Sequence, residues 1–152
     1  MQISTTTIRL RTGEGEMKCH QAQPRGQGKF PAVIVIMEAF GLNDHIKDVT
    51  ERIAAEGYVA VAPDLYYRES PNVVGYDQLQ EAIGLMQRLD ADKVVVDLQS
   101  VITHLKTQTF VIGDRVPIAE CLPLLLIPIT NFLGIGTLPV DHFRQGAVKK
   151  IL

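Results

Sequence analysis

Two continuous apolar runs stand out in the first half of the chain. The first covers residues 31–37 (PAVIVIM) and the second covers residues 58–63 (YVAVAP). Both lack the alternating polar positions of a half-exposed strand, and β-branched residues recur in them. This pattern is typical of strands that are buried on both faces of a parallel sheet. The runs therefore predict two adjacent parallel strands.

The segment between these runs has the spacing of an amphipathic helix. Asn43 or Asp44 can cap its first turn, and Gly57 stands where a helix C-terminus favours glycine. We expect a helix over about 44–56, which completes a right-handed βαβ unit. Its apolar side chains recur at helical intervals, at Ile46, Val49 and Ile53.

Strand signals also precede this unit. Residues 3–10 and 17–22 are β-prone and flank a Gly-containing turn signal at 12–15, which predicts an antiparallel hairpin. Together the elements predict an α/β fold in which an N-terminal β-hairpin is followed by parallel βαβ units.

Two helices are expected after a polar loop over residues 64–76. Asp77 is expected to cap the first, and Asp90 or Asp92 is expected to open the second. Short β-like runs follow at 110–112 and 116–118. The predicted inward side chains of the first helix are Leu79, Ala82, Ile83, Met86 and Leu89, and those of the second are Val94, Leu98, Val101 or Ile102, and Leu105.

Composition narrows the class of protein. The 152 residues suit one domain, and 46% hydrophobic with 21% charged residues is ordinary for a soluble globular chain. A net charge of −2 and the absence of Trp argue against a nucleic-acid partner. Two cysteines exclude a disulfide framework, and the first residues do not form a secretory signal, so we expect a cytoplasmic protein.

Candidate chemistry lies where the two buried runs end. Ligands of open parallel sheets bind beyond the carboxyl ends of the strands. Glu38 follows the first run and is a candidate acid, base or orienting group, although capping the next helix or facing solvent is the plainer alternative. For Asp64, after the second run, bonding within its own loop is favoured over catalysis.

The remaining polar residues do not form a familiar catalytic or metal-binding pattern. His20 and Cys19 are adjacent on a predicted strand and therefore point to opposite faces. His45 and His104 are expected to be surface or cap residues, and residues 141–142 form no recognisable triad. The chain has no metal-ligand spacing and no phosphate-binding glycine motif, so no metal and no cofactor are expected.

Two blocks of the sequence resemble the dienelactone hydrolase family. They are residues 28–43 (GKFPAVIVIMEAFGLN) and residues 54–66 (AAEGYVAVAPDLY). The resemblance covers roughly residues 3–116 and implies an α/β-hydrolase fold, of which this chain would form a part with an incomplete sheet. It also implies hydrolysis of small-molecule esters or lactones, typically an enol-lactone, by a Cys-His-Asp triad without a cofactor.

The resemblance assigns roles to two residues of the first block. Glu38 matches the glutamate that lies against the nucleophilic thiol and helps to control formation of the reactive thiolate. Ala39 matches the residue whose backbone N–H contributes to the oxyanion hole. We therefore expect Glu38 at the carboxyl end of its strand, opening onto a hollow.

The chain departs from the family pattern after residue 116. The family has a Gly-x-Cys-x-Gly elbow, whereas here Cys121 is followed by Leu122 and Pro123 and has no flanking glycine. No charged residue occurs between Cys121 and Val140, and prolines interrupt this stretch. We therefore divide the chain into a hydrolase-like part, residues 1–116, and an apolar Pro-rich tail, residues 117–152.

The expected function is that of a dienelactone hydrolase-like protein in a truncated, catalytically incompetent form. A working hydrolase with Cys121 as nucleophile and His142 as base is one alternative. Another is a binding or interaction module whose apolar tail docks on a partner or a second copy, since uncovered apolar faces promote self-association. A membrane anchor is disfavoured because the prolines of the tail make a poor bilayer helix.

Overall fold

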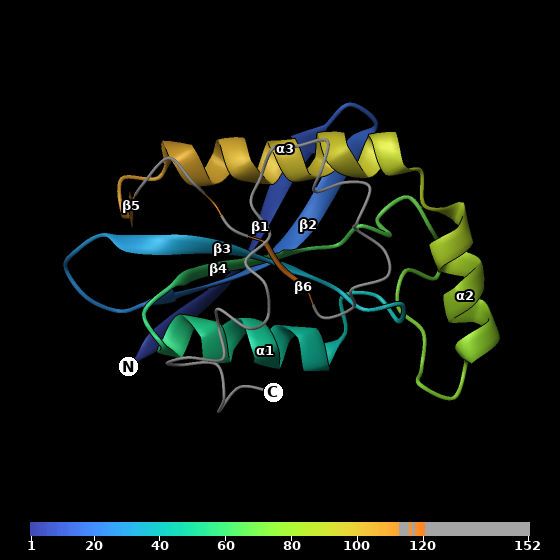
Figure 1. Ribbon diagram of the computed structural model, residues 1–152, viewed down its shortest axis with the longest axis horizontal. Coiled ribbons are helices and arrows are strands. Elements are labelled where there is room, and N and C mark those ends of the chain that lie inside the picture. Colours follow the sequence, from blue (N-terminus) through green and yellow to red (C-terminus); the bar gives the residue numbers. More distant parts are fainter. Residues whose placement is uncertain (113–115, 117, 121–152) are drawn as a thin grey trace.

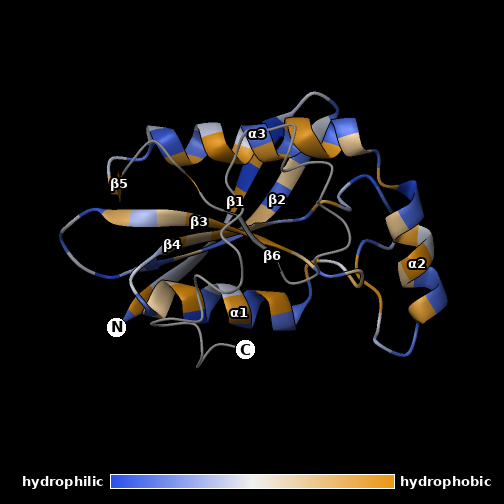
Figure 2. Cartoon of the chain, viewed as in Figure 1, coloured by the Kyte–Doolittle hydropathy of each residue, from blue (hydrophilic) through white to orange (hydrophobic). Residues whose placement is uncertain are grey.

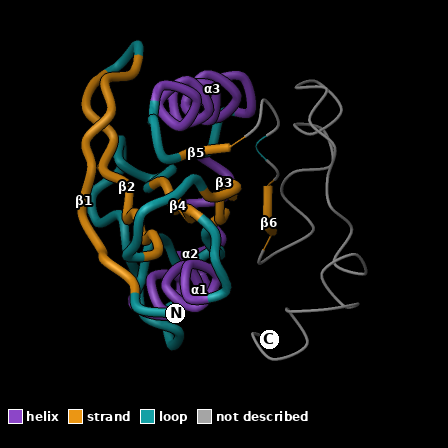
Figure 3. Tube along the Cα trace, turned by 90° about the vertical axis from the view of Figure 1, so that its left-hand side faces the viewer, coloured by secondary structure: helices purple, strands orange, loops and turns teal. Residues whose placement is uncertain are grey.

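The fold is one sheet with helices on both faces. The computed structural model describes residues 1–112, 116 and 118–120. Helices α1 and α3 lie on opposite faces of the sheet, and α2 lies beyond the carboxyl ends of β3 and β4 (Figures 1 and 3). The strands are β1 (Ile3–Thr12), β2 (Gly15–Pro24), β3 (Phe30–Ile36), β4 (Val59–Pro63), β5 (Val111–Ile112) and β6 (Ile118–Glu120), and the helices are α1 (Asp44–Ala55), α2 (Leu79–Arg88) and α3 (Ala91–Thr107).

The sheet topology confirms the predicted hairpin and βαβ unit. The strand order is β1-β2-β4-β3-β5, and β6 pairs with β3 as well. Strands β1 and β2 are antiparallel, whereas β3 and β4 are parallel and are joined through α1. Strands β5 and β6 both pair in parallel with β3, at its beginning and at its end. This is the α/β architecture that the sequence predicts.

The central strands explain why their sequences carry no polar alternation. Every residue of β4 is buried, because α1 packs on one face of this strand and α3 on the other, and residues 32–36 of β3 beside it are buried too. Figure 2 shows the same arrangement as apolar residues along the middle of the sheet and along the helix sides that face it. Burial on both faces selects apolar, often β-branched residues at successive positions.

Helix α1 begins and ends as its sequence predicts. The Asn43 side chain accepts a hydrogen bond from the Ile46 backbone N–H at 3.0 Å, which satisfies a free donor of the first turn. Gly57 follows the helix with a φ of +101°, a conformation that favours glycine. The buried side includes the predicted residues Ile46, Val49 and Ile53.

Helix α2 differs from its prediction in both its cap and its inward face. The N-cap residue is Gln78 rather than Asp77, and the Gln78 side chain accepts from the Gly75 N–H at 2.8 Å instead of capping the helix. Ala82 and Leu85 are buried, whereas the predicted inward residues Leu79 and Ile83 are exposed. The buried side of this short helix is therefore narrower than the apolar spacing predicts, and it is centred on different residues.

Helix α3 confirms its expected apolar face and adds a buried charge. Asp90 caps the helix, and the predicted inward residues are buried, including both Val101 and Ile102, which the sequence gives as alternatives. Asp97 lies on the same side, fully buried, and accepts two hydrogen bonds from the Arg68 guanidinium at 2.7 and 3.0 Å. Tyr67 donates to the same carboxylate at 3.2 Å, and Arg68 also pairs with Glu14 in the hairpin turn. The network ties the hairpin and the loop after β4 to α3.

The tail falls outside the described residues. Cys121, His142 and most of the predicted tail, 117–152, belong to that part of the chain, so the boundary after residue 116 stays a prediction. Among the helices that the structure does describe, none combines the length and the apolar character needed to cross a bilayer.

Candidate active site

The turn that follows β3 forms the core of the candidate site. It occupies residues 38–43 at the carboxyl end of the strand, where the sequence places Glu38. The Gly41 N–H donates to the Glu38 carbonyl at 3.2 Å, and the Asn43 N–H donates to the Gly41 carbonyl at 2.9 Å. Gly41 has a φ of +91°, which lets the chain reverse before α1 begins.

A second segment, residues 72–76, packs directly on this turn. The Val74 N–H donates to the Phe40 carbonyl at 3.1 Å, and Gly41 forms an isolated β-bridge with Val73. A Cβ on Gly41 would lie closer than 3.0 Å to the Asn72 carbonyl oxygen, nearer than real Cβ atoms come. From the sequence, residues 64–76 are predicted only as a polar loop, and nothing in the pattern of this loop predicts the contact.

The Glu38 carboxylate lies between two polar side chains from different elements. Tyr76 donates its hydroxyl hydrogen to Oε2 over 3.4 Å, and Nε2 of His45, in the first turn of α1, lies 3.9 Å from Oε1. The Glu38 side chain is 22% exposed, so it is neither fully solvated nor sealed in the core. The structure thus brings His45, expected to be a surface or cap residue, next to the candidate carboxylate.

The residue after Glu38, Ala39, is bonded through its carbonyl oxygen, and none of the described residues accepts from its N–H. Ala39 is buried, and its carbonyl oxygen accepts a hydrogen bond from the Tyr66 hydroxyl at 3.1 Å. Within the part of the chain that the structure describes, its backbone N–H donates to no acceptor. A backbone N–H that makes no hydrogen bond within the protein can donate to a ligand oxygen.

Asp64, at the end of β4, has the structural role that the sequence favours. Its Oδ1 accepts from the Tyr66 N–H at 3.1 Å, and its Oδ2 accepts from the Asn72 side-chain amide at 2.5 Å. Burial raises the pKa of this carboxyl group, while the two hydrogen bonds lower it. Asp64 therefore fastens its own loop, including the segment that packs on the Glu38 turn.

Cys19 and His20, two of the other titratable candidates, make their contacts away from this turn. Cys19 and His20 do point to opposite faces: Cys19 is buried, and His20 contacts Glu51 of α1 at 3.1 Å. Burial, reinforced by the charges of Asp64 and Asp97, raises the pKa of the Cys19 thiol to about 12, so it is a poor nucleophile. Among the described residues no group of His, Cys, Asp and Glu is arranged to hold a metal ion.

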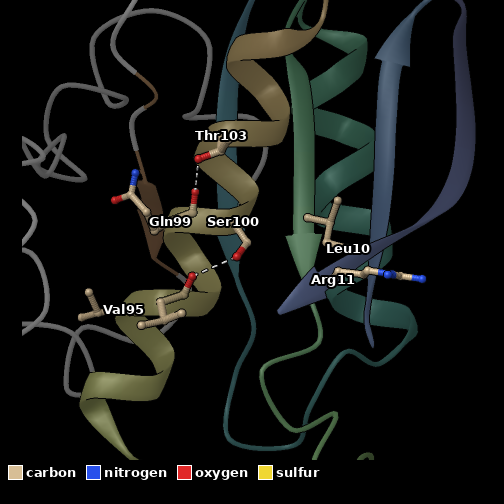
Figure 4. Close-up of a pocket in the computed structure, with 7 residues that line it drawn as sticks. Leu10, Arg11, Val95, Gln99, Ser100 and Thr103 are labelled. Atoms are coloured by element: carbon tan, nitrogen blue, oxygen red, sulfur yellow. Dashed lines mark hydrogen bonds between the residues drawn. The ribbon is translucent and has the colours of Figure 1, made fainter. Parts of the chain in front are cut away.

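A hollow lined by described residues lies elsewhere, between β1 and α3. It has a volume of about 610 Å³ and includes Leu10 and Arg11 of β1 on one side (Figure 4). On the α3 side, Ser100 and Thr103 turn their hydroxyls to the carbonyls of their own helix, at 3.1 and 2.8 Å. Those two hydroxyl hydrogens are therefore already donated within the protein, and Glu38 does not line this hollow.

Comparison with known proteins identifies the family. The sequence profile of the dienelactone hydrolase family matches residues 17–119, more than half of the chain. The chain belongs to this family. The match includes β3, the Glu38 turn and β4, which are the parts that carry the resemblance in the sequence.

Individual relatives agree with this assignment. A protein from Synechocystis sp. named as a carboxymethylenebutenolidase is 36% identical over 110 residues, which cover 70% of this chain and 45% of the relative. One from Azospirillum brasilense with the same name is 39% identical over 93 residues, covering 58% of this chain and 40% of the relative. The crystal structure of a Klebsiella pneumoniae protein named as a dienelactone hydrolase matches with a TM-score of 0.67 at 28% identity, covering 79% of this chain and 50% of the other. The chain thus spans about half the length of these relatives, or less.

Proposed function

We propose that this chain carries one half of the active site of an ester or lactone hydrolase. In this proposal the Ala39 N–H is an oxyanion donor, and Glu38 stands beside the position of the nucleophile. The observation that carries the proposal is the Ala39 N–H, which has no acceptor among the described residues and lies next to a partly buried carboxylate at the carboxyl end of β3.

The chemistry of acyl transfer explains why such a donor matters. Attack on an ester or lactone carbonyl converts its oxygen into an oxyanion, and a fixed N–H stabilises that charge without reorganising in the reaction. Removing one oxyanion donor typically costs about 3 kcal/mol of transition-state stabilisation. Tyr66 helps to fix the backbone at this position, since its hydroxyl donates a hydrogen bond to the Ala39 carbonyl oxygen at 3.1 Å.

We further propose that the 152-residue chain does not catalyse the reaction itself. The sequence around Cys121 lacks the glycines of the family elbow, and Pro123 has no backbone N–H to donate. A cysteine without a positioned base is only a few per cent ionised near neutral pH. Cys19 cannot substitute, because its thiol is buried and its pKa is raised.

Two measurements on the full chain test these statements. The first assays a chromogenic ester and an enol-lactone, with Cys121→Ala as the matched control. We expect no turnover above the uncatalysed rate in either protein. Saturable turnover that disappears in Cys121→Ala would contradict catalytic incompetence.

The second measurement tests the half-site. The enol-lactone is titrated into ¹⁵N-labelled protein, and the amide resonance of Ala39 is compared with that of Gly57 at the end of α1. We expect a saturable shift of the Ala39 resonance and none for Gly57. An Ala39 resonance that stays unchanged at millimolar lactone would refute its role as a ligand donor.

The proposal includes two statements about the protein in the cell. We place it in the cytoplasm, supported by the free, buried thiol of Cys19, since structural disulfides are typical of oxidising compartments. We also propose self-association, because four large apolar side chains are exposed along one segment of the described structure: Val73, Tyr76, Leu79 and Ile83. Sedimentation velocity over a range of concentrations tests the second statement, and a concentration-independent monomer would contradict it.

A further inference from the structure

Tyr76 occupies an unusual position for an exposed residue. The residue is 59% exposed, yet its side chain contacts three residues of the Glu38 turn. Its ring lies 4.6 Å from the Phe40 ring, centroid to centroid, with the planes tilted by 55°. This is within the range of favourable aromatic pairs, so the ring packs on the turn while the hydroxyl reaches polar groups beside it.

The direction of the hydrogen bonds at this hydroxyl follows from the cap of α1. Asn43 uses its side-chain oxygen to accept from the Ile46 N–H at 3.0 Å, and this fixes the orientation of the amide. The amide nitrogen then points to Tyr76 and donates to its hydroxyl oxygen at 3.2 Å. An amide nitrogen only donates, so the tyrosine hydrogen remains free to be given to another acceptor.

That acceptor is the Glu38 carboxylate, whose Oε2 lies 3.4 Å from the hydroxyl oxygen. We propose that Tyr76 is a positioning residue for Glu38. The α1 cap orients the Asn43 amide, the amide donates to the Tyr76 hydroxyl, and the hydroxyl donates to the Glu38 carboxylate. The inference rests on the proposed role of Glu38 beside the nucleophile, and it assigns the Tyr76 hydroxyl as the group that orients the Glu38 carboxylate. His45 lies 3.9 Å from the other carboxylate oxygen, too far for a hydrogen bond, so the hydroxyl is the directional contact.

The backbone around Tyr76 is held firmly enough for this role. The Val74 N–H bonds the Phe40 carbonyl, and Asp64 holds the Asn72 side chain. The segment that carries Tyr76 is therefore fixed on the same turn that carries Glu38. Removing the hydroxyl alone should leave the segment in place and release only the carboxylate.

The experiment compares Tyr76→Phe with Tyr58→Phe by NMR on the full chain. The Phe variant keeps the ring on Phe40 and removes only the hydroxyl, and Tyr58 directly precedes β4, at the opposite end of that strand from the Glu38 edge of the sheet. In Tyr76→Phe we expect the Hα–Hβ couplings of Glu38 to collapse toward a single averaged value, and the Asn43 side-chain amide resonances to shift. The Ile46 amide should stay unchanged in the same spectra, since the α1 cap is not altered. Tyr58→Phe should leave all of these signals as in the parent protein.

A third variant separates positioning from packing. Tyr76→Leu removes both ring and hydroxyl and should lower the urea midpoint, whereas Tyr76→Phe should leave the midpoint unchanged while the Glu38 couplings still average. Glu38 couplings that remain distinct in Tyr76→Phe would overturn the inference. None of these readings requires turnover or ligand binding, so a failed lactone titration and a failed positioning test are distinguishable.

Discussion

The contact between Gly41 and residue 72 gives the most direct test of how the site is built. We predict that Gly41→Ala destabilises the protein more than Gly57→Ala does. The two glycines are a matched pair, with φ values of +91° and +101°. They differ in space: a Cβ at Gly57 meets no atom within 4 Å, whereas a Cβ at Gly41 would run into the Asn72 carbonyl and lie 3.2 Å from the Val73 Cα.

The expected magnitudes follow from these two features. A side chain in the left-handed region costs about 1–2 kcal/mol, and this cost applies to both variants. Replacing glycine by alanine also lowers the conformational entropy of the unfolded chain, which stabilises the folded state. This contribution is the same in both variants and cancels in the comparison. Only Gly41→Ala adds steric overlap with backbone, which costs about 1–3 kcal/mol because backbone cannot move aside as a side-chain end can. The difference between the variants should therefore be at least about 1 kcal/mol.

Urea unfolding of the full chain, followed by circular dichroism, measures this difference. With a slope of about 2 kcal/mol per molar urea, the midpoint of Gly41→Ala should lie at least ~0.5 M below that of Gly57→Ala. Equal midpoints for the two variants would show that segment 72–76 does not press on the Glu38 turn. The packing that underlies the proposed positioning of the carboxylate would then be wrong.

Three further predictions concern buried polar groups. Arg68→Met should cost about 3 kcal/mol of unfolding free energy, because it leaves the fully buried Asp97 without its cation, and an unchanged urea midpoint would contradict this. In the Cys121→Ala background, Cys19 should react with a thiol reagent at pH 8 only as fast as the protein unfolds, since its pKa is raised to about 12, and rapid labelling of the native state would count against it. Burial lowers the pKa of His104 below 6.5, so the folded state binds the proton less well and stability should fall as the pH drops below 6.5; His104→Gln should show a smaller fall, and identical pH profiles would refute this cause.

Much of the fold could be predicted because its signals are local. The two apolar runs become β3 and β4 in parallel, and the segment between them becomes α1 with the expected cap and terminal glycine. Glu38 was correctly placed at a strand end, since that position depends only on where the run stops. The same local pattern misplaced the start and part of the inward face of α2, because α2 lies beyond the strand ends and its spacing does not record which of its sides is covered there.

The surroundings of the site could not be predicted in the same way. Tyr76 lies 38 residues from Glu38 in the chain, and the Arg68–Asp97 pair spans 29 residues. No periodicity or motif links such positions, so each looks like an ordinary surface residue in the sequence. His45 is the surface residue that the sequence predicts, with its side chain 48% exposed, but its approach to the Glu38 carboxylate is visible only in the structure.

The sequence by itself therefore determined the order of strands and helices along the chain, the buried core of the sheet and the place of Glu38 at the carboxyl end of β3. Burial, helical spacing and turn residues act over a few positions, and the sequence records them directly. The tertiary structure alone decided which groups surround Glu38 and Ala39. Hydrogen bonds depend on distance and direction to within fractions of an ångström, and only the packing of the 72–76 segment on the 38–43 turn sets those distances.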